Sequence, residues 1–168
     1  MNFKKNLKKS IVASLALALT SPLATATAQA ASLEVDGEVA VLTDAKTGQI
    51  LFAQDADKSH AVASMTKMLV EYVVHEEIEA GNLAWDQKIT PSDYAVQISQ
   101  NYELSNVPLL ANEQYTVKEL YDAMTIYSAN GATIALTEAT DGTEANFVDR
   151  ARKLIESWGI DDAKIYNS

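Results

Sequence analysis

The chain has 168 residues, a length suited to one domain with a buried core, and its 48% apolar and 21% charged residues are ordinary for a globular protein. The net charge of −10 argues against nucleic acid as a partner, because binding to phosphates needs a surplus of Lys and Arg. The sequence contains no cysteine, which excludes disulfides, thiol catalysis and cysteine metal sites.

The first 30 residues have the pattern of a secretory signal peptide. Four lysines precede a short apolar run over 11–19, and small residues then lead to an Ala-Gln-Ala cleavage sequence that ends at Ala30. The apolar run is too short for an ordinary membrane span. We therefore expect export, with cleavage after Ala30 and with Ala26 or Ala28 as alternatives. Removal of four lysines and no acidic residue would leave a net charge of −14.

The mature chain begins with a pattern that predicts a β-hairpin. Residues 38–43 and 49–53 are short apolar runs that contain β-branched side chains, and turn residues over 44–48 separate them. Because both runs are almost continuously apolar, we expect both faces of the hairpin to be largely covered. The Lys46-Thr47-Gly48 sequence between the runs is interpreted as turn chemistry.

The stretch from Ala61 to Val74 predicts a helix that is apolar nearly all round and therefore buried. Within residues 61–70 Lys67 is the one charged residue, three positions after Ser64, and residues at i and i+3 of a helix are neighbours. Burial favours the unprotonated amine of a lysine, which can then act as a base. If Ser64 opens the helix, the helix dipole also favours an anion there. Ser64 and Lys67 are therefore a candidate nucleophile and base, although one S-x-x-K sequence is close to the chance expectation.

Cap residues and periodicity predict mostly helices in the remainder of the chain, which is typical of a hairpin followed by a helical lobe. Asn130-Gly131 is a turn signal between two of these helices. We expect Trp85 and Trp158 in the core, His60 and His75 in surface or structural roles, and Glu76, Glu77 and Glu79 at a solvated helix end. In chain order the predicted elements are a helix end near Gly81, a short strand within 85–90, a brief helical or irregular stretch over 91–100, a loop over 101–110, a helix from the capping box Thr116-Val117-Lys118-Glu119, a buried helix over 132–139, and an amphipathic helix from Thr143 or Glu144 to before Gly159.

A hydroxyl and a carboxamide, Ser128 and Asn130, lie two residues apart at the junction of two predicted helices. Both can point into one cleft, but Ser-x-Asn is also an ordinary helix-end sequence. The order S-x-x-K, then an S-D-N type element, then K-T-G is the signature of penicillin-binding proteins and class A β-lactamases. The first two elements occur here in that order, 64 residues apart.

Residues 38–168 resemble the N-terminal part of the D-alanyl-D-alanine carboxypeptidases, the low-molecular-mass penicillin-binding proteins of the S11 serine peptidases. The resemblance rests on residues 41–51, on Ala-Ser-Met-Thr-Lys over 63–67 and on Tyr-Ser-Ala-Asn-Gly-Ala over 127–132. Residues 147–159 resemble the helix that follows in that family.

The resemblance implies an α/β (α+β) fold of the β-lactamase/DD-peptidase-like serine transpeptidase type, with an antiparallel sheet and a helical lobe. We expect only its N-terminal hairpin and helices here, so that residues 31–168 form the N-terminal portion of the catalytic domain without the K-T-G strand. That portion alone is expected to be inactive and poorly folded. Two positions depart from the family: Val62, where proline is common, and Ala129, where Gly or Asp is more frequent.

The resemblance also implies a role for each residue of the two motifs. Ser64 would be the nucleophile and its backbone N–H half of an oxyanion hole, while Lys67 would be the general base. Ser128 would relay a proton to the leaving D-alanine. Asn130 would bind the substrate backbone and help to position Lys67. No metal or organic cofactor is called for.

The function implied by the resemblance is that of an exported serine-type D-Ala-D-Ala carboxypeptidase, which acts on peptidoglycan stem peptides and is acylated by β-lactam antibiotics. It would work on the cell-wall side of the cytoplasmic membrane, with peripheral attachment through a later C-terminal segment left open. Two alternatives also stay open. One is a β-lactamase or transpeptidase that uses the same four residues, and the other is a non-catalytic cell-surface binding protein.

Overall fold

The computed structural model describes residues 35–168, so the expected signal peptide over 1–30 lies outside the described residues. The described chain divides into two compact units between Ser59 and His60, and each unit is considered by itself. No helix in residues 35–168 has the length and apolar character needed to cross a bilayer.

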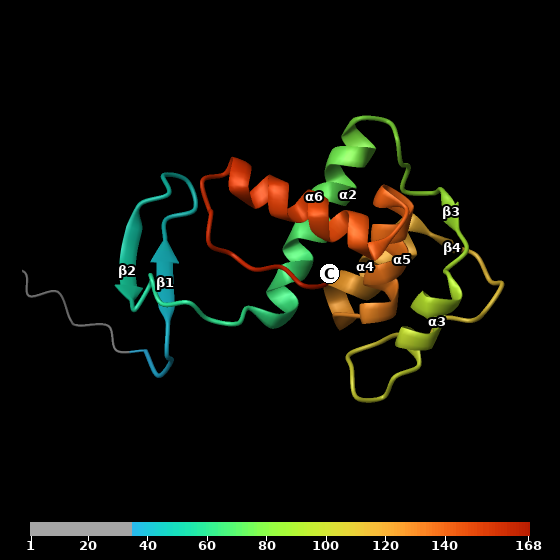
Figure 1. The fold of residues 1–168 in the computed structure, drawn as a ribbon, viewed down its shortest axis with the longest axis horizontal. Helices are drawn as coiled ribbons and strands as arrows, with labels where there is room; N and C mark the ends of the chain where they lie inside the picture. The colour runs from blue at the N-terminus through green and yellow to red at the C-terminus, as the bar shows by residue number, and fades with distance from the viewer. Residues whose placement is uncertain (1–34) are drawn as a thin grey trace, which may run out of the picture. The chain divides into compact units, whose positions relative to one another are not determined.

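The first unit is a β-hairpin of strands β1 (Ala40–Thr43) and β2 (Ile50–Gln54), which pair antiparallel (Figure 1). The turn between them is built on the Asp44 carboxylate, which accepts hydrogen bonds from the backbone N–H groups of Lys46 and Thr47 at 3.1 and 2.8 Å. Gly48 then adopts a positive φ of 71° that favours glycine. The interpretation of Lys46-Thr47-Gly48 as turn chemistry is confirmed.

The expectation that both faces of this hairpin are covered is wrong for the described unit. The side chains of Val41, Leu42, Ile50 and Leu51 are 54, 49, 62 and 58% exposed. Residues 35–59 form two strands with no second layer among them, and a two-stranded ribbon buries little apolar surface by itself. Continuous apolar runs therefore predicted the strands correctly but not what covers them.

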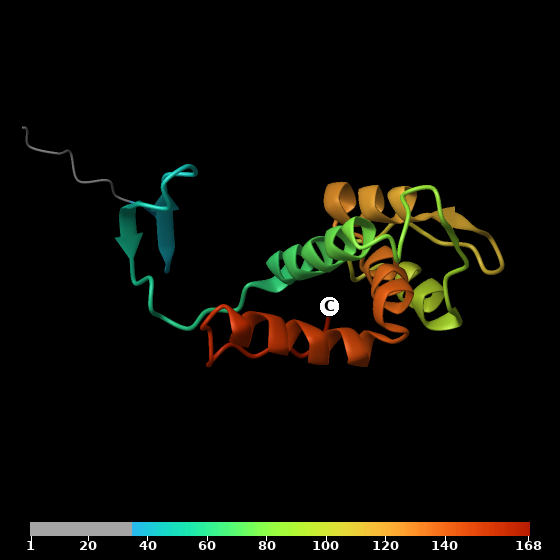
Figure 2. The same cartoon turned by 90° about the horizontal axis from the view of Figure 1, so that it is seen from above.

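The second unit is a helical bundle with a small two-stranded ribbon, in which β3 and β4 pair antiparallel (Figures 1 and 2). The predicted short strand, capped helix and amphipathic helix are confirmed, as is the irregular loop over 101–110. The stretch over 91–100, which the sequence predicts to be helical or irregular, contains a helix. In chain order the elements are a 3₁₀ turn η1 (Ala63–Thr66), α2 (Lys67–Glu79), β3 (Lys88–Ile89), α3 (Asp93–Ser99), β4 (Tyr115–Thr116), α4 (Val117–Tyr127), α5 (Asn130–Asp141) and α6 (Glu144–Ser157).

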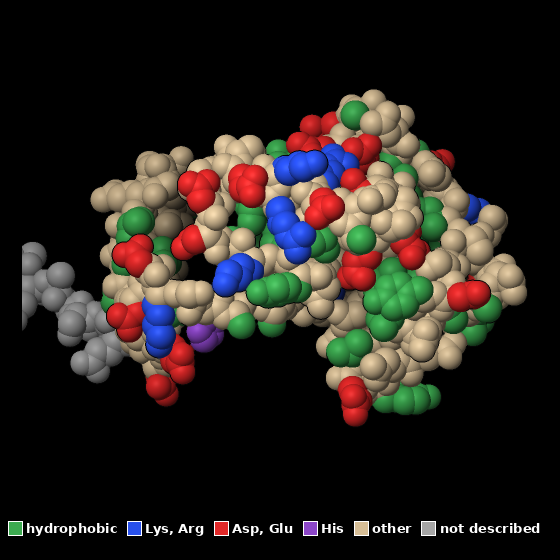
Figure 3. Space-filling view, viewed as in Figure 1, with side chains coloured by type: hydrophobic (Ala, Val, Ile, Leu, Met, Phe, Trp, Pro, Cys, Tyr) green, Lys and Arg blue, Asp and Glu red, His purple; other side chains and the backbone are tan. Residues whose placement is uncertain are grey.

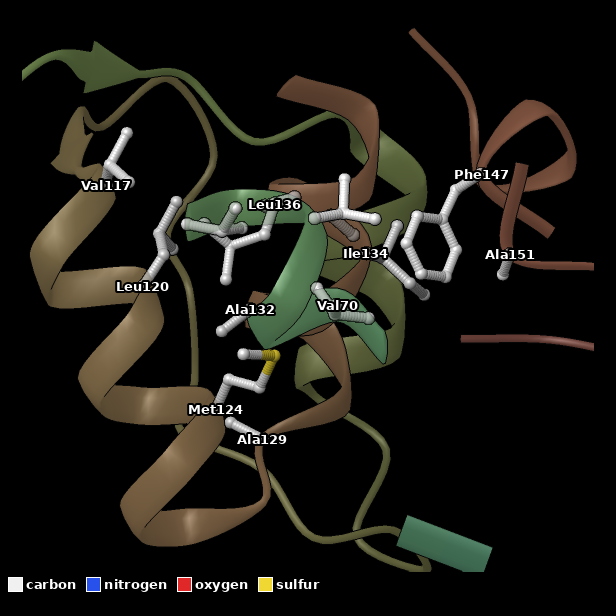
Figure 4. Close-up of a cluster of buried hydrophobic side chains, with 14 of the residues drawn as sticks. Val70, Val117, Leu120, Met124, Ala129, Ala132, Ile134, Leu136, Phe147 and Ala151 are labelled. Atoms are coloured by element: carbon white, nitrogen blue, oxygen red, sulfur yellow. The ribbon is translucent and has the colours of Figure 1, made fainter. Parts of the chain in front are cut away.

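Helix α5 is the centre of this unit and packs against α2, α3, α4 and α6. Every residue from 131 to 137 is buried, and the hydroxyls of Thr133 and Thr137 are satisfied by backbone carbonyls of their own turn. Figure 4 shows the surrounding core, where Leu120 and Met124 of α4 face Ala132 and Leu136 of α5. Full burial of a Leu or Met side chain stabilises the folded state by about 1.5–3 kcal/mol relative to leaving that side chain exposed.

Side-chain caps fix where the helices begin. The Thr116 hydroxyl accepts from the N–H of Glu119, and the Glu119 carboxylate accepts in turn from the N–H of Thr116. This reciprocal pair is the predicted capping box. Ser92 and Thr143 cap α3 and α6 in the same way, each with its hydroxyl accepting a backbone hydrogen bond.

The turn predicted at Asn130-Gly131 is wrong by two residues. The chain turns at Ser128, where φ is +54°, and α5 already begins at Asn130. Gly131 is required for close packing instead of for a turn. A Cβ atom placed there would lie 2.4 Å from Cβ of Ser99 and 2.7 Å from the carbonyl oxygen of Ala95.

We expect Gly131→Ala to destabilise the second unit by about 1–3 kcal/mol or more, because rigid backbone of α3 would have to move. Urea unfolding measures the loss. Gly37→Ala is the matched control, since a Cβ there meets its nearest neighbours at 3.7 and 3.8 Å, which is ordinary contact. Equal unfolding midpoints for the two variants would contradict this account of Gly131.

Three further expectations need correction. Helix α2 is not buried all round: it buries Val70, Val73 and Val74, whereas Met68 and Tyr72 are exposed, because α5 covers one of its faces. Trp158 is 48% exposed and contacts the ring of Tyr72 edge to face, so it is not a core residue. The end of α2 is not simply solvated, since Arg150 of α6 forms ion pairs with Glu76 and Glu77 at 3.2 and 2.7 Å.

Most charged side chains of the helices are exposed or half-buried, and Lys67 is a buried exception. Figure 3 shows acidic groups spread over this face of the second unit with fewer basic groups among them, in keeping with the net charge of −10. The surface drawn there has no continuous basic patch of the kind that nucleic acid requires.

Candidate active site

The four residues of the two predicted motifs come together in the second unit. Ser64 lies exposed in η1, and Lys67 is the first residue of α2. Their side chains are in contact, with 3.4 Å between Nζ of Lys67 and Oγ of Ser64. Ser64 therefore does not open the α-helix itself. It precedes it in a tighter turn, in which residues at i and i+3 lie almost directly above each other.

The Lys67 amine belongs to a buried residue and has uncharged hydrogen-bond partners. Its residue is 6% exposed on a helix that also buries Val70, and its two described hydrogen-bond partners, Ser64 and Asn130, are uncharged. Burial lowers the pKa of the Lys67 ammonium from its ordinary value, because the charged form loses its hydration. A larger fraction of this amine is therefore neutral near pH 7 than of an exposed lysine.

Ser128 ends α4 in a left-handed conformation with φ of 54° and ψ of 33°. This conformation is unfavourable for a side chain with a Cβ, at a cost of about 1–3 kcal/mol. It directs Oγ of Ser128 toward Ser64, with 2.9 Å between the two hydroxyl oxygens. Ala63, the residue before Ser64, also has a positive φ, of 46°. Backbone strain is thus found on both sides of the Ser64–Ser128 contact.

Asn130 is the first residue of α5, and its side chain contacts the Lys67 amine. Its Oδ1 accepts a hydrogen bond from Nζ of Lys67 at 3.1 Å. Its Nδ2 donates to the carbonyl oxygen of Ser105 at 2.9 Å, and its backbone N–H donates to the same carbonyl at 3.0 Å. The carboxamide is therefore held at both ends, and its oxygen faces the lysine.

This arrangement has the parts of an activated nucleophile. A neutral amine has a lone pair, so the contact between Lys67 and Ser64 can form with the serine hydroxyl as donor and the amine as acceptor. The second hydroxyl, on Ser128, can pass a proton onward. The structure brings together all four predicted site residues, while their roles in a reaction stay predictions.

Two residues beside the site were not found from the sequence, Ser105 and Asn106. Both lie in the loop over 101–110, which has no periodicity and no motif. No signal in a single sequence indicates that the carbonyl of residue 105 reaches a side chain 25 positions later. By contrast, the structural interpretation of His75 is confirmed: it lies 3.1 Å from the Tyr121 hydroxyl and contacts the Trp85 ring.

The chain is similar in fold to solved penicillin-binding proteins. A peptidoglycan synthesis regulatory factor (PBP3) from Streptococcus pneumoniae matches with a TM-score of 0.77 and 38% identity, over 80% of this chain and 37% of that chain. Penicillin-Binding Protein D2 from Listeria monocytogenes, solved in its ampicillin-bound form, matches with a TM-score of 0.61 and 26% identity, over 77% of this chain and 49% of that chain. The fold is accordingly that of the DD-peptidases, as predicted.

The sequence comparison gives the family. The D-alanyl-D-alanine carboxypeptidases of peptidase family S11 match residues 24–168, and the chain belongs to this family. Among curated proteins, D-alanyl-D-alanine carboxypeptidase DacF of Bacillus subtilis is 28% identical over 132 residues, which are 79% of this chain and 33% of DacF. The chain spans about a third of the length of the curated relatives it matches.

Proposed function

We propose that this protein acts as an exported serine-type D-Ala-D-Ala carboxypeptidase, which removes the terminal D-alanine from peptidoglycan stem peptides. One observation carries the proposal: an exposed Ser64 hydroxyl lies against the amine of Lys67, which is 6% exposed, and 2.9 Å from the Ser128 hydroxyl. Membership of the S11 family supports this substrate class.

The first step is acylation of Ser64. Neutral Lys67 takes the hydroxyl proton as Oγ of Ser64 attacks the carbonyl carbon between the two D-alanines. The tetrahedral intermediate collapses when the C–N bond breaks. The proton moves from the Lys67 ammonium through the Ser128 hydroxyl to the leaving D-alanine nitrogen, which departs as the free amine.

Asn130 acts on both sides of this step. Its oxygen fixes the Lys67 amine, and its carboxamide nitrogen has a second N–H that can donate to the substrate backbone. Water then attacks the ester carbonyl, the bond between the acyl carbon and Oγ of Ser64 breaks, Oγ regains a proton that comes from the water, and the shortened peptide leaves with a free carboxylate. A β-lactam would acylate Ser64 in the same way, and the ampicillin-bound structure of the Listeria relative supports β-lactams as ligands of this site.

The place of action is proposed from the sequence. The basic segment, apolar run and Ala-Gln-Ala sequence of residues 1–30 support export, and peptidoglycan lies outside the cytoplasmic membrane. The N-terminal sequence of the secreted product would locate the cleavage site, which we expect after Ala30.

The test is a comparison of two reactions of the full gene product. We expect release of D-alanine from a stem-peptide mimic that ends in D-Ala-D-Ala, and slow turnover of penicillin after stoichiometric acylation. Rapid penicillin hydrolysis without D-alanine release would identify a β-lactamase. Transfer of the acyl group to an added amino acceptor in preference to water would identify a transpeptidase. If neither acylation nor turnover is detected, the protein is a non-catalytic surface protein, and the proposal is contradicted.

A further inference from the structure

The carboxamide of Asn130 has a fixed orientation, because one of its two partners, the Ser105 carbonyl, can only accept a hydrogen bond. A backbone carbonyl can only accept a hydrogen bond, so the group that faces Ser105 O must be the NH₂. The oxygen of Asn130 is then the end that faces Nζ of Lys67. With the opposite orientation an N–H of Asn130 would point at the amine and occupy its lone pair, which is the pair that must receive the Ser64 proton.

The orientation of Asn130 therefore depends on the position of the Ser105 carbonyl. Ser105 is exposed and lies in the irregular loop over 101–110, so regular secondary structure does not hold it. The next residue supplies the anchor. The side chain of Asn106 is partly buried and forms hydrogen bonds at both ends, to two different helices.

Asn106 joins the loop to α3 and α5. Its Nδ2 donates to the carbonyl oxygen of Ile98 in α3 at 2.8 Å and to that of Asn101 at 3.2 Å. Its Oδ1 accepts from the backbone N–H of Gly131, the second residue of α5, at 2.9 Å. These partners also fix the orientation of Asn106, because the two carbonyls can only accept and the N–H can only donate.

Close packing of the two helices makes this bridge rigid. At Gly131 a Cβ atom would lie 2.4 Å from Cβ of Ser99, so α3 and α5 are nearly in backbone contact. Ser99 is itself buried, and its Oγ accepts from the N–H of Leu109 at 2.9 Å, which ties the far end of the loop to α3. The loop is thus held to the helices at two points, Asn106 and Leu109.

We propose that Asn106 is a positioning residue for the reaction at Ser64. It holds the Ser105 carbonyl against α5, and that carbonyl keeps the Asn130 oxygen directed at Lys67. The proposal rests on the function proposed above, since it assigns Asn106 to the same site. Asn106 itself touches none of the four residues Ser64, Lys67, Ser128 and Asn130 through a hydrogen bond of its side chain.

A double-mutant cycle tests this, with the rate of acylation of the full gene product by a fluorescent penicillin as the readout. We expect Asn106→Ala to lower this rate by about 10- to 100-fold, the loss that a misplaced catalytic group causes. In the Asn130→Ala background the same substitution should change the rate by no more than about twofold, because Asn106 acts through Asn130. The proposal would be overturned if Asn106→Ala lowered the acylation rate by the same factor with and without Asn130→Ala, or if it lowered the rate in neither case.

Two controls separate positioning from folding. Thr116→Ala removes a cap hydrogen bond at the far end of α4 from Ser128, so it should lower the melting temperature and leave the acylation rate within about twofold. If Asn106→Ala does not fold, Asn106→Asp keeps the acceptor for the Gly131 N–H and loses the donor to α3. We expect an intermediate loss of rate for it, and a full rate would contradict the proposal.

A measurement on the unsubstituted protein is independent of activity. The side-chain amide proton of Asn130 that faces Ser105 should exchange with solvent more slowly than that of a free asparagine, as followed by NMR. Exchange at the free rate would overturn the fixed orientation even if penicillin acylates Ser64. Conversely, slow exchange together with no acylation would contradict the proposed function and leave the orientation of Asn130 supported.

Discussion

Ser64→Ala is expected to abolish covalent labelling of the full gene product by a fluorescent penicillin, with a loss of at least about 10³-fold in acylation rate. No ester can form at residue 64 without its hydroxyl, and the neighbouring Ser128 hydroxyl, 2.9 Å away, is held at the end of α4 in a strained left-handed turn. The measurement is label per protein after a fixed incubation, read from a gel.

The matched control for this variant is Ser157→Ala. Ser157 is an exposed serine at the end of α6 whose hydroxyl donates to a carbonyl of its own helix. It should be labelled like the unsubstituted protein. Equal labelling of Ser64→Ala and Ser157→Ala would exclude Ser64 as the nucleophile.

Lys67→Arg is expected to lower the acylation rate by about 10²- to 10⁴-fold, the contribution of a general base. A guanidinium keeps its proton at all accessible pH values, so it can preserve the positive charge but cannot accept the Ser64 proton. Lys118→Arg is the control, because Lys118 is an exposed residue of α4 paired with Asp122. A rate for Lys67→Arg within a few-fold of this control would contradict the role of Lys67 as base.

The pH dependence of acylation has a definite sign in this account. The reactive form is the neutral amine, so the rate should fall as pH drops through the pKa of Lys67. Burial lowers that pKa, so this fall in rate should occur at a lower pH than the ordinary pKa of an exposed lysine. This fall in rate should be missing in Lys67→Arg, since the guanidinium keeps its proton over the same pH range.

The sequence contained enough information for the elements that local rules determine. The Thr116–Glu119 capping box placed the start of α4, and the three-residue spacing of Ser64 and Lys67 placed both side chains on one side of a helical turn. These features depend on neighbours within four positions, and hydrogen-bond or steric rules at that range hold in most folds.

Features that depend on distant packing could not be predicted in the same way. The left-handed Ser128 is unfavourable on local grounds, and Gly131 looks like a turn residue until α3 is found against it. Asn106 carries no motif at all, because its partners come from α3 and α5. The apolar run of α2 likewise indicated which side chains were apolar enough to be buried. It did not indicate which face of the helix α5 would cover.

The most direct test of the central claim is the titration of Lys67 in the full gene product, followed by NMR of lysine labelled with ¹³C at Cε. The account predicts a signal with a pKa below the ordinary value of a solvated lysine, and that this signal disappears in Lys67→Arg. If Lys67 instead has the ordinary pKa of a solvated lysine, about 10.4, the amine is cationic at neutral pH and cannot be the base that activates Ser64.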